Sequence, residues 1–508
     1  MKKKFVTTVL IALSMVAIMF LPACSNHDEP TPQRLPSVIY EYDYNTDKAT
    51  LTRVYGDSIN FTVPSTVEKD GQIFSVNAIG EETFIRCKNL KNIHIPASIR
   101  QIGLYAFNNT NISKLYIESL ESWCNINFID FTSMHHYNPY TYGNPINKNT
   151  TVFVNGEAIG ETLTIPADAR YVAGFAFQNL SGIKKLKLSE GISSIGLMAF
   201  ESCGSLEELY LPSNMKHISI GAFENTPIGK VHIPSVGDWF HISLDYSYDS
   251  EYGYYNHFAF DGTFSLYVDD KQIKDIVVPG DIETIHEFAC RNLNIQSVTV
   301  EEGVKKIGMY GLSNSLIKEI VIPKSLETIE NGAFAGTQIE NITIPGGVKT
   351  ISGGLLGNCS NLKSVIIEEG IEDIEMQAFA FCSRLEDITF PTTLKQEFYA
   401  FKGCKALSSL TFPEGFEKIT DDFRDCESLE TISFPSKLTY FDCSFLNCYR
   451  LTAIEMKCRK LPEIKEKLSV YPENIFEKCT LYVPKGCIEE YRNNSFFGKF
   501  QNIEEKIF

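Results

Sequence analysis

Cysteine recurs through the chain in one motif, Phe-x-x-Cys-x-x-Leu, and a cysteine thiol can act as a nucleophile, a metal ligand or half of a disulfide. The motif places cysteines at Cys87, Cys203, Cys382, Cys404, Cys426 and Cys448, with Cys359 in a variant that begins with leucine. Other copies carry threonine or serine at the same position, at Thr110, Thr226, Ser315 and Thr337. Because a hydroxyl residue can replace the cysteine, we predict a small buried residue that fills a turn.

Two other roles for the cysteines follow from their order in the chain. Disulfides between neighbouring copies of the motif remain an alternative, since export from the cytoplasm permits oxidation. A second alternative is a disulfide among four cysteines near the C-terminus, Cys443, Cys458, Cys479 and Cys487. Metal binding is not predicted, because no Cys-x-x-Cys pair occurs and zinc needs four converging ligands rather than a single file. No metal or cofactor is therefore expected.

Motifs for catalysis are missing from the sequence. It contains no Gly-x-Ser-x-Gly elbow, no His-Glu-x-x-His and no Gly-rich phosphate loop. Carboxylates are plentiful, so a glycosidase pair is not excluded, but nothing marks one out. The net charge of −17 argues against nucleic acid as a partner, because binding it needs a basic surface. We predict no catalytic residue and a chain that is not an enzyme.

The segment after each motif is a short alternating strand that is often closed by proline, as in "NIHIP" (92–96), "ELYLP" (208–212) and "NITIP" (341–345). Period-two alternation indicates a strand with one buried face, and proline ends it. The repeat spans 22 to 23 residues, which is too short to fold alone. Each copy must bury its apolar face against its neighbours, so we predict a mostly β repeat solenoid, a rod with a parallel sheet along it.

The combined pattern, L-x-x-I-x-I-P followed by I-G-x-x-A-F-x-x-C-x-x-L, resembles the BspA-like class of bacterial leucine-rich repeat. The resemblance extends from about Val38 to Phe508 and implies a leucine-rich-repeat rod that works by adhesion to host or neighbouring-cell proteins. Such a scaffold carries many different partners, so the resemblance does not name the ligand.

The N-terminal residues are typical of an exported lipoprotein. Lys2, Lys3 and Lys4 precede an apolar stretch without charge, which is the layout of a secretory signal peptide. "LPAC" (21–24) resembles a lipoprotein box with Cys24 as the lipidated residue. An acidic, proline-rich tether follows, and it favours display on the cell surface, outside the outer membrane, over a periplasm-facing position. The membrane is expected to hold the chain by this lipid anchor alone.

Two long segments interrupt the repeats and match each other. Each begins near a tryptophan, Trp123 or Trp239, crosses a tract rich in tyrosine and histidine, and ends in a predicted hairpin. The tryptophans either pin the insertions to the solenoid, which we favour, or bind a ligand. Both ends are predicted to be caps, and the C-terminal cap closes with one last strand and a short helix. The expected organisation is signal peptide 1–23, lipidated cysteine and tether 24–37, N-terminal cap 38–80, repeats 81–120, first aromatic insertion 121–162, repeats 163–236, second aromatic insertion 237–275, repeats 276–457 and C-terminal cap 458–508.

The candidate binding residues are aromatic side chains expected to face outward. The outward position of the strands carries large groups in early copies, His94, Tyr116, Lys187, Tyr210 and His232, and mostly β-branched residues in later ones, Val277, Thr299, Val321, Thr343, Ile366, Thr389, Thr411 and Ser433. The second insertion adds a tyrosine tract. We therefore place ligand binding within residues 90–260, at His94, Tyr116, Tyr210, His232, Tyr246, Tyr248, Tyr252, Tyr254 and Tyr255.

Three functions fit these observations. The first is a surface lipoprotein that binds extracellular proteins. The second is capture of glycans by the aromatic insertions, since aromatic rings can stack on sugar faces while carboxylates bind hydroxyl groups. The third is a structural protein of the cell envelope with no dedicated soluble ligand.

Overall fold

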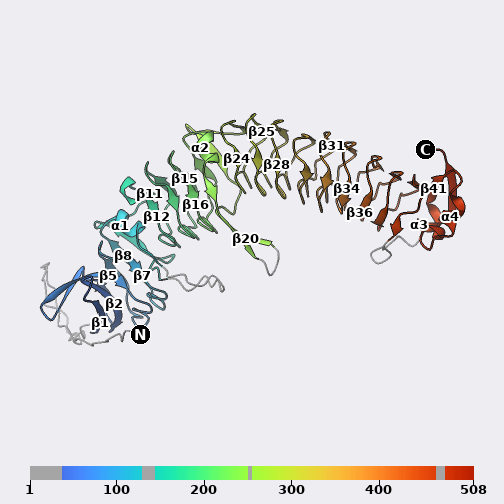
Figure 1. The fold of residues 1–508 in the computed structure, drawn as a ribbon. Helices are drawn as coiled ribbons and strands as arrows, with labels where there is room; N and C mark the ends of the chain where they lie inside the picture. Colours follow the sequence, from blue (N-terminus) through green and yellow to red (C-terminus); the bar gives the residue numbers. More distant parts are fainter. Residues whose placement is uncertain (1–36, 129–142, 250–253, 465–474) are drawn as a thin grey trace, which may run out of the picture. The chain divides into compact units, whose positions relative to one another are not determined.

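A computed structural model describes the chain except for residues 1–36, 129–142, 250–253 and 465–474 (Figure 1). The chain divides into two compact units, unit 1 (Met1–Pro234 and Leu244–Gly262) and unit 2 (Ser235–Ser243 and Thr263–Phe508). Each unit is a β-solenoid of short strands, which confirms the predicted fold class. Neighbouring strands pair residues 22 or 23 positions apart, such as Lys185 with Glu208 and Glu208 with Lys230.

Each unit has two faces of parallel strands, because each rung contributes one strand to each face, and in most rungs one of the two strands is longer. We call them the long-strand face and the short-strand face. In unit 1 the long-strand face contains β3 (Asn60–Thr62), β6 (Asn92–Ile95), β8 (Lys114–Ile117) and β9 (Thr151–Val154), and then β11 (Thr162–Ile165), β13 (Lys185–Leu188), β15 (Glu208–Tyr210) and β17 (Lys230–His232). The short-strand face contains β7 (Gln101–Ile102), β12 (Tyr171–Val172), β14 (Ser194–Ile195), β16 (His217–Ile218) and β18 (Ser243–Leu244).

Unit 2 repeats the same plan over more rungs. Its long-strand face contains β23 (Asp275–Val278), β25 (Ser297–Val300), β27 (Glu319–Val321), β29 (Asn341–Ile344), β31 (Ser364–Ile367), β33 (Asp387–Thr389), β35 (Ser409–Thr411), β37 (Thr431–Phe434), β39 (Ala453–Met456), β41 (Thr480–Pro484) and β42 (Asn502–Lys506). Its short-strand face contains β24 (Thr284–Ile285), β26 (Lys306–Ile307), β28 (Thr328–Ile329), β30 (Thr350–Ile351), β32 (Asp373–Ile374), β34 (Gln396–Phe398), β36 (Lys418–Asp422), β38 (Tyr440–Ser444) and β40 (Glu463–Ile464).

The remaining elements are caps, hairpins and short helices. The N-terminal cap consists of β1 (Ser37–Asp43), β2 (Lys48–Tyr55), β4 (Thr66–Lys69) and β5 (Gln72–Ile79). Hairpins add β10 (Glu157–Ala158), β19 (Tyr246–Asp249) with β20 (Tyr254–Phe258), and β21 (Ser265–Val268) with β22 (Lys271–Gln272). The helices are α1 (Leu120–Cys124), α2 (Val236–Phe240), α3 (Ile475–Lys478), α4 (Ile488–Arg492) and the 3-10 turns η1 (Ala167–Ala169) and η2 (Phe497–Lys499).

The core of unit 1 contains a column of stacked phenylalanine rings. In unit 1 the rings of Phe177, Phe200 and Phe223 follow one another at centroid distances of 5.3 and 5.6 Å, with interplanar angles of 8°. These rings are the Ala-Phe residues of successive copies and are fully buried. Each rung therefore completes its core only when the next rung supplies a ring, which is the physical reason for the repeat.

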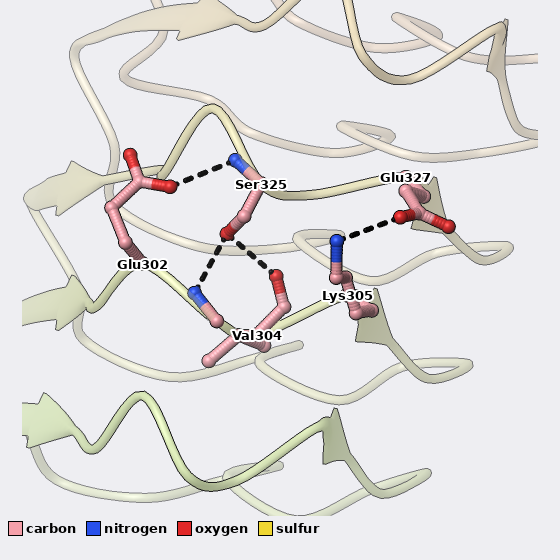
Figure 2. Close-up of polar contacts among 6 residues, drawn as sticks. Glu302, Val304, Lys305, Ser325 and Glu327 are labelled. Atoms are coloured by element: carbon pink, nitrogen blue, oxygen red, sulfur yellow. Dashed lines mark hydrogen bonds and ion pairs between the residues drawn. The ribbon is translucent and has the colours of Figure 1, made fainter.

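Polar side chains at the turns also join each rung to the next. Figure 2 shows Glu302 accepting the backbone N–H of Ser325 at 3.0 Å, and it accepts that of Lys324 at 3.1 Å as well. The Ser325 hydroxyl donates to the carbonyl of Val304 at 3.0 Å, and Lys305 forms an ion pair with Glu327 at 2.8 Å. Many of the abundant carboxylates thus have a structural role between rungs.

The structure differs from the expected boundaries at three places. Strand β3 lies within the expected cap but pairs with β6, so it is already a rung of the long-strand face. The hairpin that ends the first insertion is present, and its strand β9 also pairs with β8 as a further rung. The C-terminal cap contains the predicted strand, β41, and a short helix, α4, and it adds a further strand, β42, which pairs with β41. Strand β42 has only one buried residue, Ile503, so its alternation is weak in the sequence.

Candidate binding surface

The outward side chains of the long-strand face form a first aromatic stack in unit 1. The ring centroids of His94 and Tyr116 lie 4.2 Å apart with an interplanar angle of 5°, and those of Tyr116 and Phe153 lie 4.7 Å apart at 19°. These residues hold equivalent positions on β6, β8 and β9, so the 4.8 Å spacing of paired strands sets the ring spacing. Desolvation lowers the pKa of His94 from its ordinary value of 6.5, which favours the neutral ring.

A second stack lies on β13, β15 and β17. The ring centroids of Tyr210 and His232 lie 4.0 Å apart at an angle of 7°, and the Lys187 ammonium lies 4.9 Å from the centroid of Tyr210. Register places Lys187, Tyr210 and His232 at equivalent positions of successive strands. The five outward residues predicted from the sequence are thus brought together as two groups, the first of which is joined by Phe153. We call them the first ladder (His94, Tyr116, Phe153) and the second ladder (Lys187, Tyr210, His232).

A charged network fixes the second ladder. The Tyr210 hydroxyl donates to Glu208 at 3.1 Å, and Glu208 lies 3.0 Å from Lys185 and 3.1 Å from Lys230. Hydrogen bonding from Lys185, with further donation from Lys230 and Tyr210, lowers the pKa of Glu208 to about 2. Glu208 therefore stays ionised over the physiological range and holds the Tyr210 ring in place.

The faces of the central rings in both ladders are occupied. Tyr116 lies between two rings, and Tyr210 lies between an ammonium group and a ring. A sugar stacks on an aromatic ring only through a free face, whereas a protein surface can pack against ring edges. The ladders therefore suit a protein partner better than a saccharide.

The tyrosine tract of the second insertion lies apart from the ladders as strands β19 and β20. Across this hairpin Tyr248 pairs with Tyr255, and Tyr246 pairs with Phe258. Tyr254 pairs with Asp249, and Tyr252 lies outside the described residues, as does Cys24. The ligand-binding role given to these tyrosines stays a prediction.

Sequence reasoning did not include Phe153 among the candidate residues, although it completes the first ladder. The signal was present as "TVFV" (151–154), where Phe153 stands between two apolar residues like the outward residue of any other copy. Its segment follows a long insertion, so the rung that it forms was interpreted only as one strand of a hairpin.

The two tryptophans anchor the insertions rather than lining a binding surface. Each lies in a short helix, α1 or α2, and is only 1% exposed. The Trp123 indole donates to the carbonyl of Ala176 at 2.8 Å, and the Trp239 indole donates to that of Ala289 at 2.9 Å. Serine caps both helices, at Ser119 and Ser235. The matching contacts support duplication of a larger unit.

The recurring cysteine is buried and donates a hydrogen bond to the preceding rung. The Cys203 thiol donates to the carbonyl of Phe177 at 3.2 Å. Equivalent bonds of 3.0–3.3 Å are made by Cys359, Cys382, Cys404, Cys426 and Cys448. Thr226 makes the same contact to Phe200 at 2.7 Å, so threonine can replace cysteine there. Thr110 and Ser315 donate instead to a carbonyl of their own rung, three residues earlier. The predicted turn-filling role is confirmed, and the hydrogen bond adds a second reason for the residue type.

The described thiols have low chemical reactivity. All thirteen described cysteines are buried thiols outside any disulfide, including the four near the C-terminus between which a bridge had stayed open. Burial raises the pKa of Cys203 to about 12 and that of Cys87 to about 11. A thiol with such a pKa supplies almost no thiolate at neutral pH.

We expect this burial to prevent thiol labelling in the folded protein. A form of residues 25–508, which lacks Cys24, should react with a disulfide reagent such as DTNB at pH 8 at fewer than about one thiol per chain. In denaturant all thirteen should react. Rapid labelling of several thiols in the folded protein would contradict the buried arrangement.

A serine, a histidine and an aspartate meet on the short-strand face of unit 1, but their geometry is not that of a catalytic triad. Asp245 lies 3.1 Å from His217 Nε2, and the Ser219 hydroxyl lies 3.3 Å from the same nitrogen. A triad needs the aspartate on one ring nitrogen and the serine on the other. Within the described ranges, no three side chains of the metal-ligating types gather into a site. Of the helices that the structure describes, none is long and apolar enough to cross a membrane.

The carboxylates that join neighbouring rungs make the stability of the fold fall at acidic pH. Backbone N–H donation from Lys324 lowers the pKa of Glu302, and that from Thr392 lowers the pKa of Glu369. A carboxyl whose pKa is lower in the folded state stabilises the fold above its unfolded pKa of 4.5. This contribution is lost as pH falls from about 4.5 toward the folded values.

We therefore expect a flat melting temperature between pH 7 and about pH 5 and a continuous fall below about pH 4.5. Thermal melts followed by circular dichroism should show this profile. The variant E302Q/E369Q should have a shallower fall, because glutamine does not titrate. A melting temperature that stays constant from pH 5 to pH 3 would contradict the role assigned to these carboxylates.

The fold and its turn chemistry define a class of protein, the leucine-rich repeat solenoid. The match to the family described as "BspA type Leucine rich repeat region" covers residues 72–155, 149–242, 264–386 and 372–504. The chain therefore belongs to the BspA-type leucine-rich repeat family. The search of curated protein sequences found no match.

Several solved structures are similar to this chain. A leucine-rich repeat protein from Bacteroides ovatus is 17% identical, with 87% of this chain and 100% of that chain covered and a TM-score of 0.41. A leucine-rich cell surface protein from Faecalibacterium prausnitzii is 20% identical, with 78% and 95% covered and a TM-score of 0.41. The pneumococcal vaccine antigen PcpA is 17% identical, with 94% and 98% covered and a TM-score of 0.42.

Proposed function

We propose that this chain is a non-enzymatic surface lipoprotein that binds proteins of a host or of neighbouring cells through the two ladders of unit 1. The observation that carries the proposal is the contrast between the units. The long-strand face of unit 1 presents stacked aromatic and cationic groups, whereas most of the equivalent positions of unit 2 carry β-branched residues such as Thr299 and Thr343. Tyr482, near the C-terminal end of unit 2, is an aromatic exception. Aromatic residues dominate the energetics of protein interfaces.

The anchor forms the second part of the proposal. The basic start, the apolar stretch and Cys24 support attachment by a lipid, and the tether that follows supports display outside the outer membrane. Protease treatment of intact cells tests this part. We expect cleavage of the chain while periplasmic control proteins survive. Protection of the chain would remove surface display and favour a scaffolding role inside the envelope.

The ladders are tested by giving unit 1 the outward residues of unit 2. The variant Y116T/Y210T introduces a β-branched residue, which favours strands, at both positions, so the rungs should still form. Biolayer interferometry of the purified protein against a panel of immobilised extracellular proteins should identify a ligand whose affinity falls about tenfold or more in this variant. The control T299A/T343A changes the same positions in unit 2 and should bind normally. Equal binding by all three proteins would exclude the ladders as the interface.

A further inference from the structure

The short-strand face of unit 1 contains a shallow hollow of about 330 Å³ that is separate from both ladders. Its wall includes Tyr171 on β12, Ser194 on β14 and His217 on β16, together with Asn125 and Asn127 from the segment after α1. A volume of this size lies at the lower end of small-ligand sites.

Three small residues also line the hollow, Ala173, Gly174 and Gly196. Adjacent rungs approach closely here, since a Cβ atom at Gly196 would lie 2.4 Å from the backbone nitrogen of Gly174 and only glycine fits. These small residues add little side-chain bulk to the lining.

Tyr171 has an exposed ring without a stacked aromatic neighbour, unlike the ladder tyrosines. Its side chain is 42% exposed, and no described aromatic ring stacks on it. By contrast, Tyr116 and Tyr210 have both ring faces occupied. An exposed phenol ring beside a polar hollow can support the apolar face of a sugar while its hydroxyl forms a hydrogen bond.

His217 is held in a defined orientation at the edge of the hollow. Its Nε2 lies 3.1 Å from Asp245 and 3.3 Å from the Ser219 hydroxyl. In neutral histidine the proton therefore belongs on Nε2, facing the carboxylate, and Nδ1 carries the acceptor lone pair. Ser194 adds a hydroxyl group, and the Asn125 amide adds a carbonyl oxygen.

The chemistry of the lining selects an uncharged ligand. No Lys, Arg, Asp or Glu lines the hollow, and the chain as a whole has a net charge of −17. An anionic group would find no cation there, and a cationic group would find no carboxylate in the lining. Hydroxyl, amide and imidazole groups around an aromatic ring match a polyhydroxylated neutral molecule.

We propose that this hollow is a binding site for a neutral saccharide, with Tyr171 as the stacking platform and Ser194 and His217 as hydrogen-bond partners. The site goes beyond the protein-binding role of the ladders. It lies on the other strand face of unit 1 and requires none of the ladder residues.

The test is calorimetric titration of residues 25–508 with neutral gluco-, manno-, galacto- and xylo-oligosaccharides. We expect at least one of them to bind, with Y171A weakening it about tenfold or more and Y171F by less than about threefold. S194W, which fills the hollow, should also abolish binding. The control Y449A removes a tyrosine of unit 2 that is 73% exposed and should bind like the original protein.

Three results would overturn the proposal: no binding by any of these sugars, binding that Y171A and S194W leave unchanged, or equal binding of sialylated oligosaccharides. Circular dichroism of each variant checks that the fold is kept. The ladder variant Y116T/Y210T separates the two proposals, because it should lose protein binding and keep saccharide binding. Loss of saccharide binding in that variant would count against a separate site.

Discussion

Replacing Trp123 with alanine is expected to lower the free energy of unfolding by about 3–5 kcal/mol. The side chain is 1% exposed, its ring packs edge-on against Phe128 at 5.2 Å, and its indole N–H donates to the carbonyl of Ala176 at 2.8 Å. Alanine lacks the indole ring, so it would leave a large cavity and remove that hydrogen bond. Urea unfolding followed by far-ultraviolet circular dichroism measures the change.

The protein supplies its own controls for this experiment. W123F keeps an aromatic ring and removes only part of the volume and the N–H group, so its effect should be about half as large or less. Trp239 in unit 2 then becomes the sole tryptophan and reports that unit by fluorescence. W239A is the matched change, since this residue is equally buried and donates to Ala289. Wild-type stability of W123A would show that α1 is not an anchor.

Thr226→Val should cost about 2–4 kcal/mol, although the two side chains have nearly the same shape. The Thr226 hydroxyl is buried and forms hydrogen bonds with two backbone groups of the preceding rung. It donates to the carbonyl of Phe200 at 2.7 Å and accepts the N–H of Cys203 at 3.1 Å. Valine leaves both backbone groups buried without a partner, and each such group costs about 1–3 kcal/mol.

Thr226→Ser is the matched control, because it keeps the hydroxyl and loses only a methyl group. Its cost should be about 1 kcal/mol. Thr226→Cys introduces the residue that other copies use and should lie between the two variants, since a thiol is a weaker donor. A ranking in which valine is more stable than serine would mean that volume rather than hydrogen bonding decides this position. Urea midpoints of the three variants give the ranking directly.

The solenoid was predictable because its signal is local and repeated. The strand, the proline, the Ala-Phe pair and the Cys-x-x-Leu turn occur within one rung, and every copy reports the same structure. Substitution between copies also showed that Cys203 and Thr226 are equivalent, which predicted a small buried residue. What escaped prediction was the pairing of β3 with β6, β9 with β8 and β42 with β41. Each of these segments lies in a cap or at the end of an insertion, where the regular repeat pattern is interrupted.

The candidate binding surface was predictable only in part. Alternation along "NIHI" and "ELY" places His94 and Tyr210 outward, and this follows from the period of a strand. The alternation does not show that both faces of the Tyr116 ring are covered, because that depends on residues of the two neighbouring rungs. The sequence could therefore not decide between ring faces for sugars and ring edges for proteins.

The amino-acid sequence by itself determined the repeat, the buried column of cysteine and phenylalanine, and the enrichment of aromatic residues in the first half, because each depends on residues within one rung. Only the tertiary structure decided which carbonyl each thiol reaches, how the rings stack, and that Tyr171, Ser194 and His217 line one hollow. Those properties depend on distances between residues that lie 22 or more positions apart. The stacking of rungs sets these distances, and no pattern within a single rung encodes them.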